Sequence, residues 1–272
     1  MVQESKPLVS VIIHSYNRFE YLLNALDSVH NQTYNNFEII LLNDDSDEEE
    51  YYTYNFSNKI KKIDIERKNY PDWPGSRQAL INIGSQNANG KFLAFLDDDD
   101  IWLPNKLEIQ IKKMIENNYI FSSTEGFFGN GVYDINKNYP LYNQEHFFKI
   151  LKKKYKKTNY LKSGQFPEVW DYNFLNIHNC IIKSSVIVEK AIFDKIGGIR
   201  GLPKNADYDC WLSLLNSTNL LYVDTPLFYY DGAHGSGKNY NTRAMFWNIT
   251  YVGDTEVYVN GVAKGPGVWI AC

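Results

Sequence analysis

Residues 91–100 read KFLAFLDDDD, an apolar stretch that ends in four consecutive aspartates. A continuous apolar run of this kind is typical of a strand buried on both faces, as in the parallel sheets of α/β proteins. Pro104 follows, and apolar side chains then recur at helical spacing from Leu107 to Ile115, which predicts a helix opened by the proline. The segment therefore predicts a buried strand, an acidic group at its carboxyl end and a helix.

Two similar apolar runs precede this segment. Leu8–His14 (LVSVIIH) and Phe37–Leu42 (FEIILL) predict buried strands, and residues 19–30 between them have helical spacing. Asn17 and Glu20 form a capping-box pattern at the start of that helix. Strand, helix and strand in this order predict a parallel pair joined by a right-handed crossover.

Weaker patterns cover much of the remaining chain. They predict a short strand at 63–65, a helix at 79–88, helices at 186–193 and 211–215, a strand at 222–230 and a hairpin at 256–263 with an Asn-Gly turn. Residues 120–175 have no regular pattern. The alternation of strands and helices in the first half indicates an α/β protein.

Composition narrows the class of protein. The 272 residues are 44% hydrophobic and 22% charged, which is typical of a globular domain. A net charge of −4 argues against a nucleic-acid partner bound through its phosphates. The three cysteines lie far apart, no signal-peptide pattern opens the chain, and no run approaches the ~18 apolar residues of a membrane helix. We therefore expect a cytoplasmic protein with no transmembrane segment.

The aspartate run Asp97–Asp100 needs compensation for its charge. Adjacent carboxylates at the end of an apolar strand repel one another, and a bound cation relieves that repulsion. In extended geometry Asp97 and Asp99 share one side of the chain. Oxygen ligands suit Mg²⁺ or Mn²⁺, with water and a diphosphate completing the coordination. The alternative is a solvated acidic turn, whereas an EF-hand loop is excluded because Trp102 stands where such a loop requires glycine.

A second acidic cluster, residues 44–50 (DDSDEEE), follows the strand at 37–42. In open α/β sheets, ligands bind in the crevice beyond the carboxyl ends of the strands. We therefore expect the two acidic clusters to meet at one edge of the sheet, although they lie far apart in the sequence.

Three motifs in this order resemble a known family. They are PLVSVIIHSYNR (7–18), NQTYNNFEIILLNDDS (31–46) and NIGSQNANGKFLAFLDDDDIWLPNKLE (82–108), with further matches at 179–201, 206–215 and 225–230. Together they resemble the family 2 glycosyltransferases, including the bacterial SpsA-like enzymes. The resemblance implies a GT-A fold, which is a Rossmann-like mixed β-sheet flanked by helices, with a DxD motif at the carboxyl end of a strand.

The resemblance also implies how the chain is divided. A single catalytic domain would cover residues 1–235, with a nucleotide-sugar-binding half at 1–118 and an acceptor-binding half at 119–235. Residues 236–272 would form a C-terminal extension that contains the small hairpin.

Contacts to a nucleotide-sugar donor are implied for the loop after the first strand. His14, Tyr16 and Asn17 occupy that loop, and Tyr16 would stack on the base. Asp44 matches the aspartate that hydrogen-bonds a uracil imide, which favours a UDP-sugar. The family's arginine before the DxD strand is replaced by Ile81. Arg77, four residues earlier on the same helical face, would reach the donor phosphate instead or be a surface charge.

The DxD region is implied to hold Mn²⁺ or Mg²⁺. Asp98 matches the family residue near the ribose and Asp99 the principal metal ligand, with Asp97 a candidate for either role. His234 lies where the family has a histidine that approaches the metal or the diphosphate, and a plain loop histidine is the alternative.

The catalytic base is implied to be Asp207, in ADYDCW (206–211). The glutamate that precedes it in the family is here Ala206. Asp209 is the alternative base, and either aspartate has helix capping as its alternative role.

The implied activity is metal-dependent, inverting transfer of a sugar to a hydroxyl of a glycan or other acceptor. A non-catalytic nucleotide-sugar-binding module is an alternative. A sugar nucleotidyltransferase is another, although it would usually have a glycine-rich loop after the first strand. The basic cluster at 149–157 (KILKKKYKK) is compatible with a solvated helix face, and also with docking to an anionic acceptor or peripheral contact with a membrane.

Overall fold

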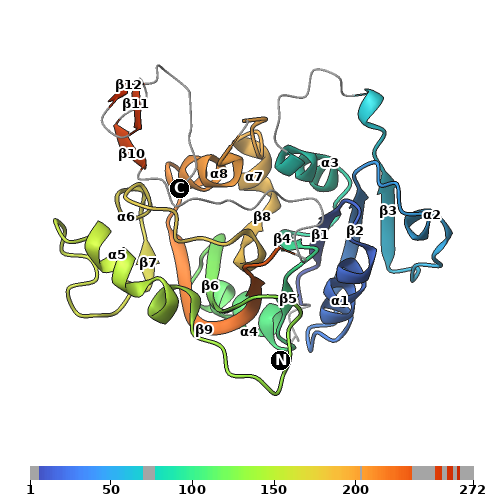
Figure 1. The fold of residues 1–272 in the computed structure, drawn as a ribbon, viewed down its shortest axis with the longest axis horizontal. Helices are drawn as coiled ribbons and strands as arrows, with labels where there is room; N and C mark the ends of the chain where they lie inside the picture. Colours follow the sequence, from blue (N-terminus) through green and yellow to red (C-terminus); the bar gives the residue numbers. More distant parts are fainter. Residues whose placement is uncertain are drawn as a thin grey trace.

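The computed structural model describes residues 6–69, 77–202 and 204–234, together with the backbone of three short strands beyond residue 248. The central element is a nine-stranded mixed sheet. Its order is β3 (Ile60–Asp64), β2 (Phe37–Asn43), β1 (Val9–Ser15), β4 (Phe92–Asp97), β8 (Ile187–Glu189), β6 (Phe121–Gly129), β9 (Leu220–Asp231) and β5 (Ile101–Trp102), with β7 (Val169–Trp170) paired to β9. The expected α/β class with a mixed sheet is confirmed (Figure 1).

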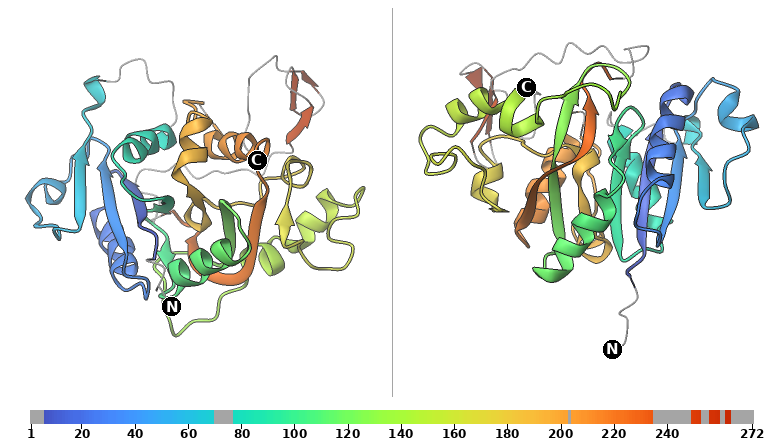
Figure 2. Two further views of the ribbon diagram at one scale, coloured as in Figure 1. Left: turned by 180° about the vertical axis from the view of Figure 1, so that it is seen from behind. Right: turned by 90° about the horizontal axis from the view of Figure 1, so that it is seen from below.

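Helices cover both faces of the sheet (Figures 1 and 2). One face carries α1 (Phe19–His30) and α4 (Lys106–Glu116), and the other carries α3 (Ile81–Gln86), α7 (Lys190–Lys195) and α8 (Ala206–Leu215). The shorter helices and turns are α2 (Glu50–Thr53), α5 (Phe148–Lys154), α6 (Tyr172–Leu175), η1 (Arg67–Asn69), η2 (Arg77–Leu80), η3 (Tyr142–His146) and η4 (Lys183–Ser185). None of the helices in the described residues is long and apolar enough to cross a membrane.

Burial of both sheet faces explains the continuous apolar runs. Val11 and Ile13 of β1 pack in the same core as Leu22 of α1, whereas Ile12 between them packs in the opposite core with Trp211 of α8. All five side chains are at most 1% exposed. Successive side chains of such a strand point into opposite hydrophobic layers, so polar and apolar residues do not alternate along it.

The four N-terminal strands confirm the predicted parallel pairing. β1 pairs in parallel with β2 and with β4, and β2 pairs in parallel with β3. Gly84 lets α3 pack closely on β1, because a Cβ atom there would lie 2.6 Å from the Ile12 side chain. The carboxyl ends of these strands therefore lie along one edge.

The predicted capping box of α1 is wrong. The N-cap is Arg18, which makes no side-chain capping bond, and Asn17 has a left-handed φ of +51° outside the helix. The Glu48 carboxylate instead accepts the Phe19 backbone N–H at 2.8 Å, and so caps α1 from the loop after β2.

The second half differs from the sequence prediction in two elements. The helix predicted at 186–193 is strand β8 followed by α7, because β8 fills the gap between β4 and β6 and pairs antiparallel with both. β6 was not predicted, since it contains the polar run Ser122–Glu125, which is nonetheless at most 3% exposed. β9 is confirmed and runs parallel to β6.

A separate small sheet lies near the end of the chain. It consists of β10 (Ile249–Val252), β11 (Glu256–Val259) and β12 (Val262–Ala263). β11 and β12 pair antiparallel, while the Asn260-Gly261 turn between them lies outside the described residues.

Candidate functional site

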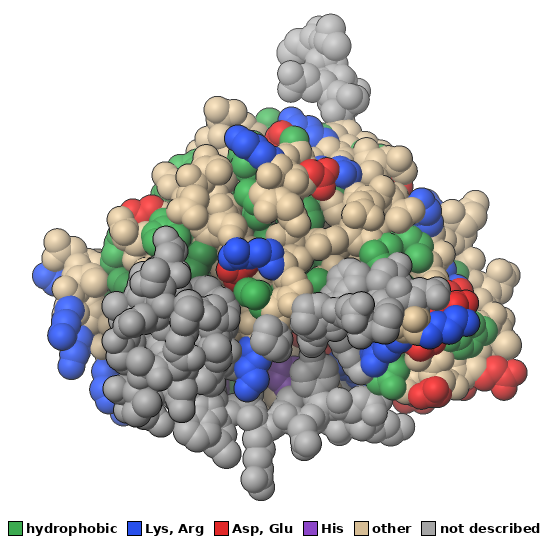
Figure 3. All heavy atoms as spheres, turned by 90° about the horizontal axis from the view of Figure 1, so that it is seen from above, with side chains coloured by type: hydrophobic (Ala, Val, Ile, Leu, Met, Phe, Trp, Pro, Cys, Tyr) green, Lys and Arg blue, Asp and Glu red, His purple; other side chains and the backbone are tan. Residues whose placement is uncertain are grey.

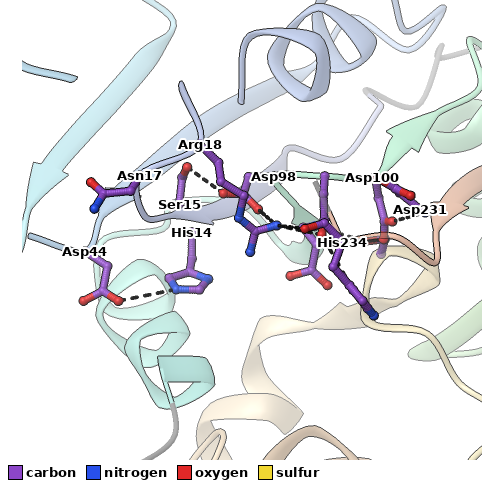
Figure 4. Close-up of polar contacts among 12 residues, drawn as sticks. His14, Ser15, Asn17, Arg18, Asp44, Asp98, Asp100, Asp231 and His234 are labelled. Atoms are coloured by element: carbon purple, nitrogen blue, oxygen red, sulfur yellow. Dashed lines mark hydrogen bonds and ion pairs between the residues drawn. The ribbon is translucent and has the colours of Figure 1, made fainter. Parts of the chain in front are cut away.

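The carboxyl ends of β1, β2 and β4 bring three distant segments to one edge of the sheet. His14 on β1 is in register with Asp97 on β4 and with Leu42 on β2. Just beyond β2, the Asp44 backbone N–H donates to the Ser15 carbonyl at 2.9 Å. The close-up in Figure 4 shows the resulting row of polar side chains along this edge. We refer to this edge of the sheet as the cleft edge.

Asp44 is the centre of a polar cluster at one end of the row. Arg67 donates from Nε and a terminal nitrogen to the two Asp44 carboxylate oxygens, at 3.0 and 2.7 Å. The guanidinium carbon lies 4.7 Å from the centroid of the Tyr16 ring. Burial tends to raise the pKa of Asp44, but the nearby His14 ring and the bonds with Arg67 outweigh it and hold the pKa below its usual value.

His14 is a neutral side chain with unsatisfied nitrogens. Burial lowers its pKa, against the opposing effect of Asp44, so the imidazole is uncharged at pH 7. Nε2 lies 3.8 Å from an Asp44 oxygen, and neither ring nitrogen has a hydrogen-bond partner among the described residues. Buried polar atoms of native proteins are usually paired, so His14 is suited to contact a ligand at this edge.

Asn17 is held by the protein itself. Its side-chain amide donates to Asp47 at 3.1 Å and accepts the Asp47 backbone N–H at 2.6 Å. Its left-handed backbone suits asparagine. Asn17 therefore fixes the turn between β1 and α1, which carries Tyr16.

The aspartate run alternates in direction. Asp98 and Asp100 point into the protein, at 4% and 0% exposed. Asp98 accepts the Ser15 hydroxyl at 2.7 Å, and Asp100 accepts the Ser184 hydroxyl at 2.5 Å and the Asp231 backbone N–H at 3.0 Å. Burial raises the pKa of both carboxyls. Asp97 is the most accessible of the four, with its side chain 30% exposed.

Asp99 contacts two basic side chains. Arg18 donates to its Oδ2 at 2.7 Å and also lies 3.3 Å from Asp98 Oδ1. His234, which follows β9, has its Nδ1 3.8 Å from the same Asp99 oxygen (Figure 4). Burial tends to raise the pKa of Asp99, but His234 and Arg18 lower it overall, so the carboxylate is ionised. Two of the three candidate metal ligands, Asp99 and His234, are thus side by side.

Lys183, in η4, pairs with the aspartate run. Its ammonium forms an ion pair with Asp97, although the lysine side chain is only 6% exposed. Asp207, in the first turn of α8, is partly exposed and is acted on electrostatically by both Lys183 and Asp97. Burial raises the pKa of Asp207, while a backbone hydrogen bond and Lys183 oppose that rise.

Asp209 has a different environment from Asp207. It is 3% exposed and binds the Arg200 guanidinium through both oxygens. This pair ties the loop at 197–201 to α8. Of the two candidate bases, Asp207 is the partly exposed one.

Three basic residues of the site were missed by sequence reasoning. Arg18 and Arg67 are single charges in polar segments that offer no pattern. A signal for Lys183 was present in the sequence. This lysine ends the apolar run CIIK, and a charged side chain next to buried residues usually has a partner of opposite charge. Arg77, by contrast, was predicted to reach the donor. Its backbone lies in η2 and its side chain lies outside the described part of the structure.

Comparison with known proteins gives the family. The model of a family described as "Glycosyl transferase family 2" matches residues 10–178. The chain belongs to glycosyl transferase family 2.

Relatives of this family 2 chain include both characterised and uncharacterised proteins. An Escherichia coli protein is 30% identical over 221 residues, 80% of this chain and 73% of its own length. It is named UDP-Glc:alpha-D-GlcNAc-diphosphoundecaprenol beta-1,3-glucosyltransferase WfgD. An uncharacterized glycosyltransferase of Rickettsia bellii is 45% identical over 117 residues, 43% of this chain. The chain covers only 16% of that relative's length.

Solved structures identify the fold of the family 2 chain as GT-A. Staphylococcus aureus TarS 1–349 in complex with UDP matches with a TM-score of 0.58 at 18% identity, covering 82% of this chain and 60% of TarS 1–349. The complex with UDP-GlcNAc matches with the same TM-score and covers 85% and 61%. At this identity the likeness concerns the fold alone.

A divalent cation fits the residues at the cleft edge in one particular way. In the described residues, no group of three or more His, Cys, Asp or Glu side chains is placed to hold a metal. Asp99 and His234 do converge, and a carboxylate with an imidazole is a suitable donor pair for Mn²⁺. Such a site would be completed by diphosphate and water rather than by protein.

Proposed function

We propose that this family 2 chain transfers a sugar from a UDP-sugar to an acceptor hydroxyl, with inversion at the anomeric carbon and with Mn²⁺ or Mg²⁺. The observation that carries the proposal is the ion pair between Asp97 and Lys183, whose charges both act electrostatically on Asp207. It couples the nucleotide-binding edge to an aspartate suited to accept a proton. A donor half at 1–118 and an acceptor half at 119–235 would form one catalytic domain.

The nucleoside would bind at the Asp44 cluster. His14 has unsatisfied nitrogens there, Tyr16 offers a ring face, and Asp44 and Arg67 together offer an acceptor and a donor for the base. Asp97 has the exposure needed to contact the ribose, which Asp98 lacks. The WfgD name and the TarS complexes with UDP and UDP-GlcNAc support a uridine diphosphate donor.

Asp99 and His234 would hold the cation, and Arg18 would keep the Asp98 and Asp99 carboxylates in place. When bound, the cation supplies Lewis-acid stabilisation of the departing diphosphate. Lys183, which forms an ion pair with Asp97, places a second positively charged side chain at the same edge.

Asp207 would accept the proton of the acceptor hydroxyl. Its raised pKa makes it a stronger base than a solvated aspartate, and the charge of Lys183 limits that rise. Attack from the Asp207 side, opposite the leaving diphosphate, inverts the anomeric centre. The buried free thiols of Cys180 and Cys210 fit a reducing compartment, which supports a cytoplasmic site of action.

The test is release of UDP from a panel of UDP-, GDP- and dTDP-sugars with Mn²⁺, Mg²⁺ or EDTA. Asp99→Asn and Asp207→Asn should each lose at least ~100-fold in turnover, since removing one catalytic group typically costs that much. Asp224→Asn, an exposed position on β9, is the matched control. Donor binding by wild type without turnover under any condition would favour the binding-module alternative.

A further inference from the structure

Lysines are concentrated in one surface lobe, residues 145–171, which we call the basic lobe. It contains Lys149, Lys152, Lys153, Lys154, Lys156, Lys157 and Lys162, against Glu145, Glu168 and Asp171. Seven positive and three negative charges give +4, whereas the whole chain has −4, so the remaining residues carry −8. A lobe opposite in sign to the rest of the molecule gives the surface an orienting field.

The local fold forces these charges outward. Leu151 and Tyr155 are 2% and 1% exposed and anchor α5 and the turn after it to the core. The helix therefore has one buried side, and the exposed lysines project from the others. Lys149, Lys152 and Lys153 project from α5, and Lys156, Lys157 and Lys162 are exposed in the segment after it.

The lysines of the basic lobe differ from many other surface lysines in their pairing. Seven surface lysines elsewhere form ion pairs, namely Lys6, Lys62, Lys68, Lys91, Lys112, Lys137 and Lys190. Within the described residues, no carboxylate pairs with any of the six exposed lysines of the lobe. Their charge is therefore available to an external anion.

Two apolar side chains accompany the charges. Ile150, within the lysine run, is 43% exposed, and Val169 at the other end of the lobe is 37% exposed. Basic residues with a few apolar neighbours on one surface are typical of contact with the interface of an anionic membrane.

We propose that the basic lobe docks the protein on a bilayer that contains anionic phospholipid. Two pockets of the described residues, one lined by Asn82 and Gly198 and the other by Asp27 and Phe56, lie outside the lobe. The proposal rests on the proposed function and adds that the acceptor hydroxyl is carried by a lipid. The name of the E. coli relative, with its diphosphoundecaprenol acceptor, supports that choice.

The lobe forms one side of the molecule. Lys and Arg side chains gather along the left edge of Figure 3, the side on which Figure 1 places α5. Figures 1 and 2 show the lobe at the side of the sheet where β7 and β9 lie, away from β2 and β3.

The test is cosedimentation of the full chain with vesicles of phosphatidylcholine alone or with 30% phosphatidylglycerol, a composition chosen to give the surface about −30 mV or more. Wild type should bind only the anionic vesicles and be released by 0.5 M NaCl, well above the ionic strength at which the Debye length is about 8 Å. The quadruple variant Lys152→Gln, Lys153→Gln, Lys156→Gln and Lys157→Gln should lose at least ~50-fold in partitioning, given the cost per removed charge.

A matched variant tests whether binding depends on the lysines of the basic lobe or only on the net charge of the protein. Lys68→Gln, Lys112→Gln, Lys137→Gln and Lys195→Gln removes the same charge from exposed positions elsewhere and should bind as wild type does. Equal losses in both variants would overturn the proposal, as would equal binding of wild type to neutral vesicles. UDP release without vesicles should be unchanged in the basic-lobe variant, so a failure of docking is distinguishable from a failure of the proposed transferase activity.

Discussion

Lys183 is the residue whose removal should change the site most specifically. Lys183→Ala leaves Asp97 without its ion pair and removes the positive charge near Asp207. We expect kcat/KM for UDP release to fall by ~10–100-fold, the usual cost of a lost charge-assisted contact. Lys183→Arg should recover part of it. Lys190→Ala, which breaks an exposed pair with Asp194, should have no effect, and an equal loss there would contradict the assignment.

The pH dependence of turnover should report on Asp207. A general base acts only when it is deprotonated, and burial raises the pKa of Asp207. We therefore expect kcat/KM to rise with pH along a limb centred above the ordinary aspartate range. The pH profile of the residual activity of Asp207→Asn should lack this rise. If the rise persists in the variant, it is caused by the ionisation of another group.

The same carboxyl should reduce stability at neutral pH. Because its folded pKa is raised, the native state binds more protons than the unfolded state between the two pKa values, and stability falls as pH rises through that interval. Asp207→Asn should therefore have a higher Tm than wild type at pH 8, with the difference shrinking as the pH falls toward the ordinary aspartate value. Thermal melts at several pH values test this, and Asp224→Asn should show no such trend.

At the residue scale, sequence reasoning found the acidic side chains and missed their basic partners. Asp44, Asp97 and Asp99 end apolar strands, and a strand end is visible in the sequence. Arg18 and Lys183 pair with these aspartates only because distant segments of the chain meet in the fold. A local sequence pattern does not contain that information. The functional roles of all these residues remain predictions.

Among the elements, the start of α1 should depend on a residue from another loop. Glu48→Ala removes the carboxylate that accepts the Phe19 N–H, so the free energy of unfolding should fall by ~1 kcal/mol, the usual cost of a lost cap. For a chain of this size, that corresponds to a Tm about 2–4 °C lower. Glu49→Ala at the neighbouring exposed position is the control, and an equal shift in both would show that the bond to Phe19 is not the cause.

Elements were predictable where hydrophobicity alone decided them. β1, β2 and β4 are continuous apolar runs because both sheet faces are covered. β6 escaped prediction because Glu125 and its polar neighbours are buried through hydrogen bonds. The Glu125 carboxylate accepts backbone N–H groups of Asn143 and Gln144 and the Tyr222 hydroxyl. β8 was taken for helix because three residues are too few to show a strand period, and its position depends on two neighbours in the sheet.

For the whole molecule, the proposed halves should not fold separately. β4 pairs on one side with β1 and on the other with β8, which comes from the second half. A fragment of residues 1–118 would expose that β4 edge and the core face containing Phe95. We expect it to be insoluble or unfolded, whereas a fragment of residues 1–235 should retain the Tm of the full chain. A folded, soluble 1–118 fragment would contradict this expectation, and circular dichroism and solubility measure it.

The shared sheet also constrains how ligands enter and leave. Hydrogen bonds of β8 to both β4 and β6 make the backbone of the two halves continuous, so a hinge motion between them would have to break strand pairing. Access to the cleft edge is therefore controlled by local rearrangement of rim segments on a rigid frame. Molecules that enter in sequence, such as a donor and then an acceptor, would be ordered by loop movement and not by domain closure.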